Sequence, residues 1–100
     1  MDADDQTLLA ARPHIPEHVA ERRFGGDSVA LNLHSGQYHG LNAVATRMFD
    51  ALRGAETVGD VVDPLAAEFG QPREVIERDL LVFVRGLAER GLVELDGESG

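Results

Sequence analysis

The chain has 100 residues, 43% of them hydrophobic, and a formal net charge of −9 from 18 acidic and 9 basic residues. This length predicts one domain with a modest core, and the charge argues against DNA, RNA or an anionic membrane as the main partner, because those partners are bound largely through neutralised phosphates. The lack of cysteine excludes disulfides, thiol nucleophiles and the usual structural zinc sites. No apolar run is long enough to cross a bilayer, and the acidic N-terminus is unlike a secretory signal, so a cytoplasmic protein is expected.

Residues 1–17 are predicted to form a flexible N-terminal tail. Acidic residues come first, and Pro13 and Pro16 would break any helix that begins at Thr7. The domain itself is expected to cover residues 18–95, and the acidic, glycine-rich end at 96–100 is expected to be disordered.

Three short strands are predicted after the tail. A weak strand over 18–24 leads into a glycine-rich turn, and residues 28–34 then alternate, so that successive side chains lie on opposite faces. Ser35 and Gly36 make a second turn before a third strand over 37–41, in which Tyr38 is expected to be a half-buried anchor. The faces of the middle strand are Val29, Leu31 and Leu33 on one side and Ala30, Asn32 and His34 on the other. Three consecutive antiparallel strands predict a β-meander.

Three helices and a short extended piece follow the meander. The helices are expected to run from an N-cap at Asn42 to Gly54, from an N-cap at Thr57 to Gly70, and from Pro72 to Arg90. Pro64 lies inside the second segment, which therefore predicts a kink or two short pieces. Gly91 ends the last helix, and the fold class is α+β.

The last helix carries two apolar stripes. One is expected to face the core and consists of Ile76, Leu80, Phe83, Val84 and Leu87. The second lies beside it and consists of Val75, Asp79, Val82 and Gly86. An apolar surface wider than the core requires is either a broad packing face or the wall of a groove, and Asp79 within it could accept a hydrogen bond from a bound chain.

The sequence offers little for catalysis. His34 and His39 are the candidate metal ligands, but a site needs three or four ligands and no partner is placed to complete one. The serines lack a neighbouring base, and the carboxylates are too scattered to name an acid–base pair. We therefore expect a non-catalytic protein without a cofactor or metal.

Three segments together carry a family resemblance. They are G-x-Y-x-x-L-N from Gly36 to Asn42, T-V-x-x-V-V from Thr57 to Val62, and R-D-L-x-x-F-V-x-x-L from Arg78 to Leu87 followed by G-L-V. This ordered set resembles the PqqD-like family, the RiPP recognition elements, and looks most like the stand-alone leader-binding B proteins of lasso-peptide biosynthesis.

The resemblance implies a winged-helix-like domain that binds the leader of a ribosomally made precursor peptide. In such domains the leader adds as a strand to the third β-strand and lies against the third helix. Carried over to this chain, the peptide-binding residues are Gln37, Tyr38, His39, Gly40, Leu41, Val75, Asp79, Val82, Phe83 and Gly86. The implied partners are the precursor, a leader peptidase and a macrocyclase, and the exposed edge strand permits either a monomer or a weak homodimer.

Two other hypotheses remain open at the level of sequence. A winged-helix DNA-binding regulator fits the predicted topology, although the acidic charge opposes it. A small enzyme or metal protein built on His34 and His39 is the second, and it lacks further ligands.

Overall fold

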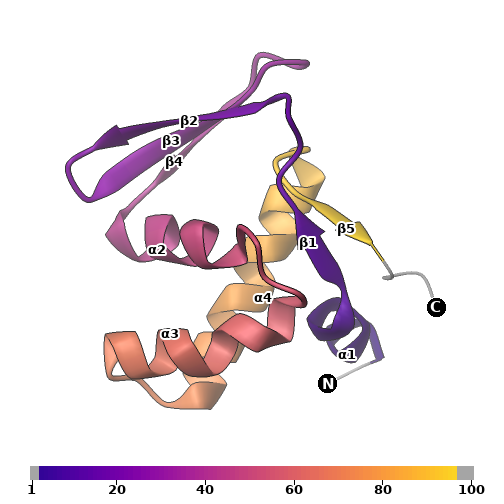
Figure 1. Ribbon diagram of the computed structural model, residues 1–100, viewed down its shortest axis with the longest axis vertical. Helices are drawn as coiled ribbons and strands as arrows, with labels where there is room; N and C mark the ends of the chain where they lie inside the picture. The colour runs from indigo at the N-terminus through magenta and orange to yellow at the C-terminus, as the bar shows by residue number, and fades with distance from the viewer. Residues whose placement is uncertain (1–2, 97–100) are drawn as a thin grey trace.

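The protein is described here by a computed structural model, which covers residues 3–96. A three-stranded antiparallel sheet in the order β2-β3-β4 lies on one side, and the helices lie on the other (Figure 1). The strands are β2 (Val19–Phe24), β3 (Asp27–Asn32) and β4 (Tyr38–Leu41), followed by α2 (Ala43–Leu52), the 3-10 helix η1 (Val58–Val61), α3 (Val62–Phe69) and α4 (Arg73–Glu89). The predicted α+β class, meander first and helices after, is confirmed. Winged-helix-like describes it only loosely, because the strands precede the helices along the chain.

Local signals set the helix boundaries. The Asn42 side chain accepts a hydrogen bond from the Ala45 backbone N–H at 2.9 Å, and Thr57 caps η1 in the same way. The segment around Pro64 forms two short pieces, η1 and α3, as expected, because proline is tolerated in the first turn of α3. Gly70 ends α3 with a φ of 63°, a left-handed conformation that glycine adopts without strain.

The N-terminal segment differs from the expected tail. Residues 3–14 contain helix α1 (Ala3–Ala10) and strand β1 (Arg12–His14), which pairs with β5 (Glu94–Asp96) in a separate two-stranded sheet. Leu8 is only 2% exposed, so α1 docks on the body of the domain through an apolar contact. Pro13 is accommodated because β1 is a short edge strand. Most of the end expected to be disordered, 97–100, lies outside the described residues.

The core lies between the sheet and the helices. Its largest fully buried side chains include Phe49, Leu52, Leu65 and Leu80. The predicted core stripe of α4 is confirmed for Ile76, Leu80, Val84 and Leu87, whereas Phe83 is only partly buried. Leu81 is also buried, on the side of α4 toward α1, where a tail was expected.

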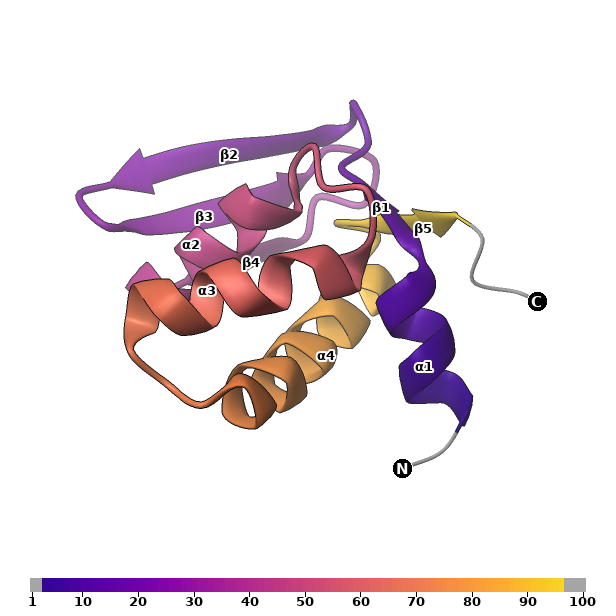
Figure 2. The same ribbon diagram turned by 60° about the horizontal axis from the view of Figure 1, so that its bottom comes forward.

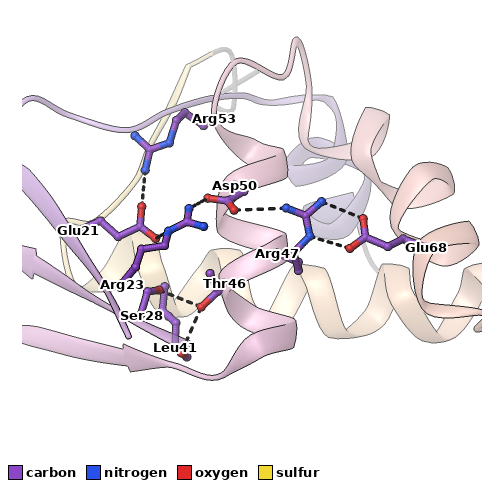
Figure 3. A network of polar contacts seen from close by, with 9 residues as sticks. All are labelled: Glu21, Arg23, Ser28, Leu41, Thr46, Arg47, Asp50, Arg53 and Glu68. Atoms are coloured by element: carbon purple, nitrogen blue, oxygen red, sulfur yellow. Dashed lines mark hydrogen bonds and ion pairs between the residues drawn. The ribbon is translucent and has the colours of Figure 1, made fainter. Parts of the chain in front are cut away.

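The sheet face that meets the helices is largely polar. Glu21 of β2 pairs with Arg53 at 3.0 Å, Arg23 pairs with Asp50, and these contacts continue through Arg47 to Glu68 on α3 (Figure 3). Below them, the buried Ser28 hydroxyl lies 2.9 Å from that of Thr46 (Figure 3). Polar contacts therefore join the sheet to α2, with Ala30 as the buried apolar residue of β3, while Val29 and Leu31 face the other way.

Candidate functional site

A cleft lies between strand β4 and helix α4. It is a hollow of about 530 Å³ lined by His39, Arg78, Asp79, Val82, Phe83, Gly86 and Arg90. Its floor is apolar, and Val82 is 66% exposed there, an unusual exposure for a valine in the middle of a helix. Gly86 has no side chain to fill the space, so the helix backbone is accessible from the cleft.

Strand β4 forms the other wall and is the edge of its sheet. The carbonyl of Gln37 accepts a hydrogen bond from the Asn32 N–H at 2.8 Å, so Gln37 bonds toward β3. In an antiparallel pair, alternate residues bond the same neighbour, so the backbone groups of Tyr38 and Gly40 are turned away from β3. Among the described residues no strand pairs with this edge. It can therefore accept a further strand beside the cleft.

Asn32 holds the two walls of the cleft together. Its side-chain oxygen accepts hydrogen bonds from the N–H groups of His34 and Ser35, which shapes the turn before β4. Its amide donates to the carbonyl of Arg90 at 3.0 Å, at the end of α4. A Cβ on Gly91 would lie 2.7 Å from this amide, so glycine is required there both for space and for its φ of 70°. The position of β4 relative to α4 is thus set by polar contacts of one buried side chain.

Charge in the cleft is mixed. Burial, and then the positive charge of Arg90, lower the pKa of His39 below its ordinary value of 6.5. The Arg90 guanidinium donates to the Gly86 carbonyl at 3.1 Å and so lies along the rim. Asp79 is 3.9 Å from Arg78, and both side chains are more than half exposed. The cleft therefore offers an apolar floor, a neutral imidazole, an exposed carboxylate beside Arg78, and a second guanidinium at Arg90.

The predicted site residues separate into three groups. His39, Asp79, Val82, Phe83 and Gly86 come together as lining of the cleft, while Tyr38 and Gly40 contribute the free edge beside it. Gln37 belongs to the third group, because its carbonyl bonds toward β3.

The remaining predicted residues occupy other positions. The Leu41 side chain is in the core at 2% exposure, and Val75 is half-buried and does not line this hollow. Tyr38, expected to be half-buried, is 74% exposed because it points from the sheet face that no described helix covers.

Sequence reasoning missed the two arginines of the cleft. Arg78 and Arg90 extend the stripe of Val82 and Gly86 at four-residue spacing, which places all four on one face of α4. Continuing the stripe one turn in each direction would have identified them.

The histidines considered as metal ligands do not meet. His34 stacks on His18 with ring centroids 4.0 Å apart, and His39 lines the cleft. Within residues 3–96 no group of three or more potential ligands is close enough to hold a metal ion. Across the same residues no helix is long and apolar enough to cross a lipid bilayer.

Comparison with known proteins identifies the family. Residues 27–93, more than half of the chain, match the family described as Coenzyme PQQ synthesis protein D (PqqD). The chain belongs to the PqqD family. It is 30% identical to a PqqA binding protein of Bradyrhizobium diazoefficiens over 84 residues, which are 84% of this chain and 82% of that protein. A PqqA binding protein of Gluconobacter oxydans is 34% identical over 53 residues, 53% of this chain and 55% of the relative.

Solved structures of similar proteins contain bound peptides. The chain resembles TbiB1 in complex with the TbiA(beta) leader peptide, with a TM-score of 0.73, 35% identity, and coverage of 83% of this chain and 94% of TbiB1. It also resembles lasso peptide synthetase B1 complexed with the leader peptide, with a TM-score of 0.74, 26% identity, and coverage of 84% and 99%. The predicted likeness to RiPP recognition elements and to lasso-peptide B proteins is confirmed, and the two curated relatives are named as PqqA binding proteins.

Proposed function

We propose that this PqqD-family protein binds the leader segment of a ribosomally made precursor peptide, without catalysing a reaction on it. The observation that carries the proposal is the free edge of β4 directly beside the cleft of α4. Main-chain hydrogen bonds to an edge give affinity for any extended peptide, and the neighbouring pocket selects its side chains. The leader-bound structures of similar proteins support the same reading.

In the proposed complex each wall of the cleft has its own role. An added leader strand bonds to the outward backbone groups of Tyr38 and Gly40. Every second leader side chain then points toward α4, where Val82, Phe83 and Gly86 accept an apolar group. Arg78 and Arg90 at the rim favour carboxylates on the flanking leader residues.

The charge of α4 disfavours the DNA-binding alternative. Arg73 pairs with Asp63 at 2.8 Å and with Glu77 at 2.9 Å, and Arg85 pairs with Asp5. These acids neutralise the helix that would have to enter a DNA groove, and the whole chain carries a net charge of −9. A peptide ligand fits this surface better than a phosphate backbone.

In the proposed pathway, the leader is next cut from the bound precursor and the remaining peptide is cyclised. We assign those steps to a separate leader peptidase and a macrocyclase, as in the lasso-peptide systems that this chain resembles. The role of this chain is to hold the leader in an extended conformation and so raise the local concentration of the precursor for both enzymes.

The test is binding of a fluorescent leader peptide, taken from a precursor encoded beside this chain, measured by fluorescence polarisation. We expect micromolar or tighter affinity, about −8 kcal/mol or beyond. Val82→Glu should weaken binding by about a hundredfold or more, because the bound leader would have to bury the new carboxylate on the apolar floor of the cleft.

The matched control is Val44→Glu. Val44 is a 47% exposed valine on α2 that does not line the cleft, so this variant should bind like the wild type. Both variants should keep the wild-type circular dichroism spectrum. Equal affinity of the Val82→Glu variant and the wild type would refute the proposed cleft.

A further inference from the structure

A second hollow lies on the other flank of helix α4. It has a volume of about 290 Å³ and is bounded by α4 and by helix α1, which packs beside it (Figure 2). Leu81 and Val82 form its apolar floor. Helix α1 precedes residues 27–93, the segment that matches the PqqD family. The second hollow therefore includes a wall that the family match does not cover.

The second hollow and the cleft share one wall. Arg78 and Val82 line both of them, and the two residues lie about one helical turn apart, so the shared wall is a ridge along α4. Val82 is 66% exposed on this ridge. A peptide confined to the cleft covers one side of the valine, whereas a chain that continues over the ridge covers both sides. A ligand that crosses the ridge therefore gains more from burying this side chain than one that stops at it.

One carboxylate of the second hollow has no counter-ion. The other charged residues around the hollow take part in ion pairs, namely Asp5–Arg85, Glu77–Arg73 and Arg78–Asp79. Glu74, in the first turn of α4, is exposed and makes no ion pair with any residue of the described range 3–96. A positively charged ligand group placed in this hollow would therefore meet a carboxylate that no arginine occupies.

Resting on the proposed function, we propose that the leader continues from the cleft over the Val82 ridge and places one lysine or arginine side chain in the second hollow. The aliphatic stem of that side chain lies on Leu81 and Val82, and its charged group pairs with Glu74. All of these contacts are made by α4, and α1 only bounds the hollow. The two hollows then select opposite charges, because the cleft presents Arg78 and Arg90 to the leader.

A cation on a long apolar stem is the group that fits the second hollow best. A leader carboxylate would be repelled by Glu74, and a purely apolar side chain would leave Glu74 unpaired beneath the bound peptide. Residues 3–96 bring no three potential metal ligands together, so a metal ion is a poorer occupant than an ammonium or guanidinium group. The net charge of −9 also favours a basic ligand segment.

The test is a double-mutant cycle between Glu74 and the basic residues of the leader. The probe is the fluorescent leader peptide of a precursor encoded beside this chain, and each of its lysine and arginine residues is replaced by alanine in turn. Glu74→Lys should weaken binding of the unchanged leader about tenfold in fluorescence polarisation, because it brings two cations together. One of the alanine peptides should bind the wild type and this variant with affinities within about twofold of each other.

The matched control is Glu56→Lys. Glu56 is exposed, lines neither hollow and makes no ion pair within the described part of the chain. Its substitution changes the net charge by the same amount as Glu74→Lys, so an effect of overall charge would appear in both variants. Glu56→Lys should bind the leader like the wild type, and both variants should keep the wild-type circular dichroism spectrum.

Each result separates the two proposals. Failure of the wild type to bind the leader overturns both. Three results overturn the second hollow as a leader subsite and leave binding in the cleft intact: wild-type affinity in Glu74→Lys, an equal loss in Glu56→Lys, or a loss in Glu74→Lys that no single alanine substitution in the leader removes. A leader that binds but contains no lysine or arginine overturns the subsite as well.

Discussion

The two sheets of this small domain differ in the position of their strands and in whether an edge strand is left open beside a cleft. The two-stranded sheet joins the ends of the domain, pairing Arg12 with Asp96, and its strands are three residues each with a proline in one of them. The three-stranded sheet leaves β4 open beside an apolar cleft. From this comparison we infer that the two-stranded sheet contributes to stability and the three-stranded sheet to recognition, although both are short and antiparallel. Changes in each should therefore affect different measurements.

The largest expected effect on stability is at α1, the helix that leads into the two-stranded sheet. Leu8→Ala removes the buried contact of α1, and we expect the free energy of unfolding to fall by about 2–5 kcal/mol in urea denaturation. Leader affinity at low temperature, where the variant remains folded, should stay within about twofold of the wild type. A loss of affinity without a loss of stability would assign α1 to the binding site instead.

A proline at the open edge of β4 should lower leader affinity and leave the stability of the domain almost unchanged. Gly40→Pro removes a backbone N–H that is turned away from β3, so the sheet keeps its own hydrogen bonds. A Cβ at this position meets nothing within 4 Å, so the first side-chain atom does not clash with the rest of the domain. We expect leader affinity to fall about tenfold, the equivalent of one main-chain hydrogen bond, measured by fluorescence polarisation. Gly40→Ala keeps the N–H and should bind normally, and equal loss in both variants would contradict strand addition.

The pH dependence of leader binding should reflect the titration of the His39 side chain. Its pKa is lowered, so the imidazole is neutral at pH 7, and a leader that covers it disfavours the charged form further. Leader affinity should therefore be constant above pH 6.5 and fall as the pH decreases below that value. His39→Gln should remove this dependence, and a titration by isothermal calorimetry between pH 5 and 8 checks it. Affinity that rises on acidification would show that a leader carboxylate contacts His39.

The smallest expected effect on stability is the loss of the ion pair between α1 and α4. Asp5 on α1 pairs with Arg85 on α4, but the Arg85 side chain is 43% exposed and water screens the pair. Asp5→Ala should therefore change the free energy of unfolding by at most about 1 kcal/mol, far less than Leu8→Ala. A loss of several kcal/mol would mean that charge, rather than apolar contact, holds α1.

Local signals were sufficient to predict most of the fold. Asn42, Thr57 and Gly70 act within a few residues of themselves, so their roles follow from sequence. The helix α1 and strand β1 were missed because their stability comes from distant contacts, such as the Val58 N–H to the Ala11 carbonyl at 2.9 Å. As predicted, no helix continues through Pro13, but this proline does not prevent a short edge strand.

The cleft was predicted in outline, and its chemistry only in part. The stripe through Val82 and Gly86 indicates an exposed apolar helix face, but the assignment of that face to a cleft came from family resemblance rather than from periodicity. Alternation along β3 defines two faces and does not say which one is covered. That choice depends on partners for the polar face, such as Thr46 for Ser28 and the Arg90 carbonyl for Asn32, which lie on other elements.

The pairing of β1 with β5 also bears on the order of folding. It joins residues 80 or more positions apart, whereas the meander and α2 are built from neighbours in the chain. Closing so long a loop is entropically costly, so we expect the meander to form early and the terminal strands to pair last. Leu8→Ala should then accelerate unfolding and leave the folding rate almost unchanged. During synthesis on the ribosome, β1 has to wait for its partner until nearly the whole domain has emerged.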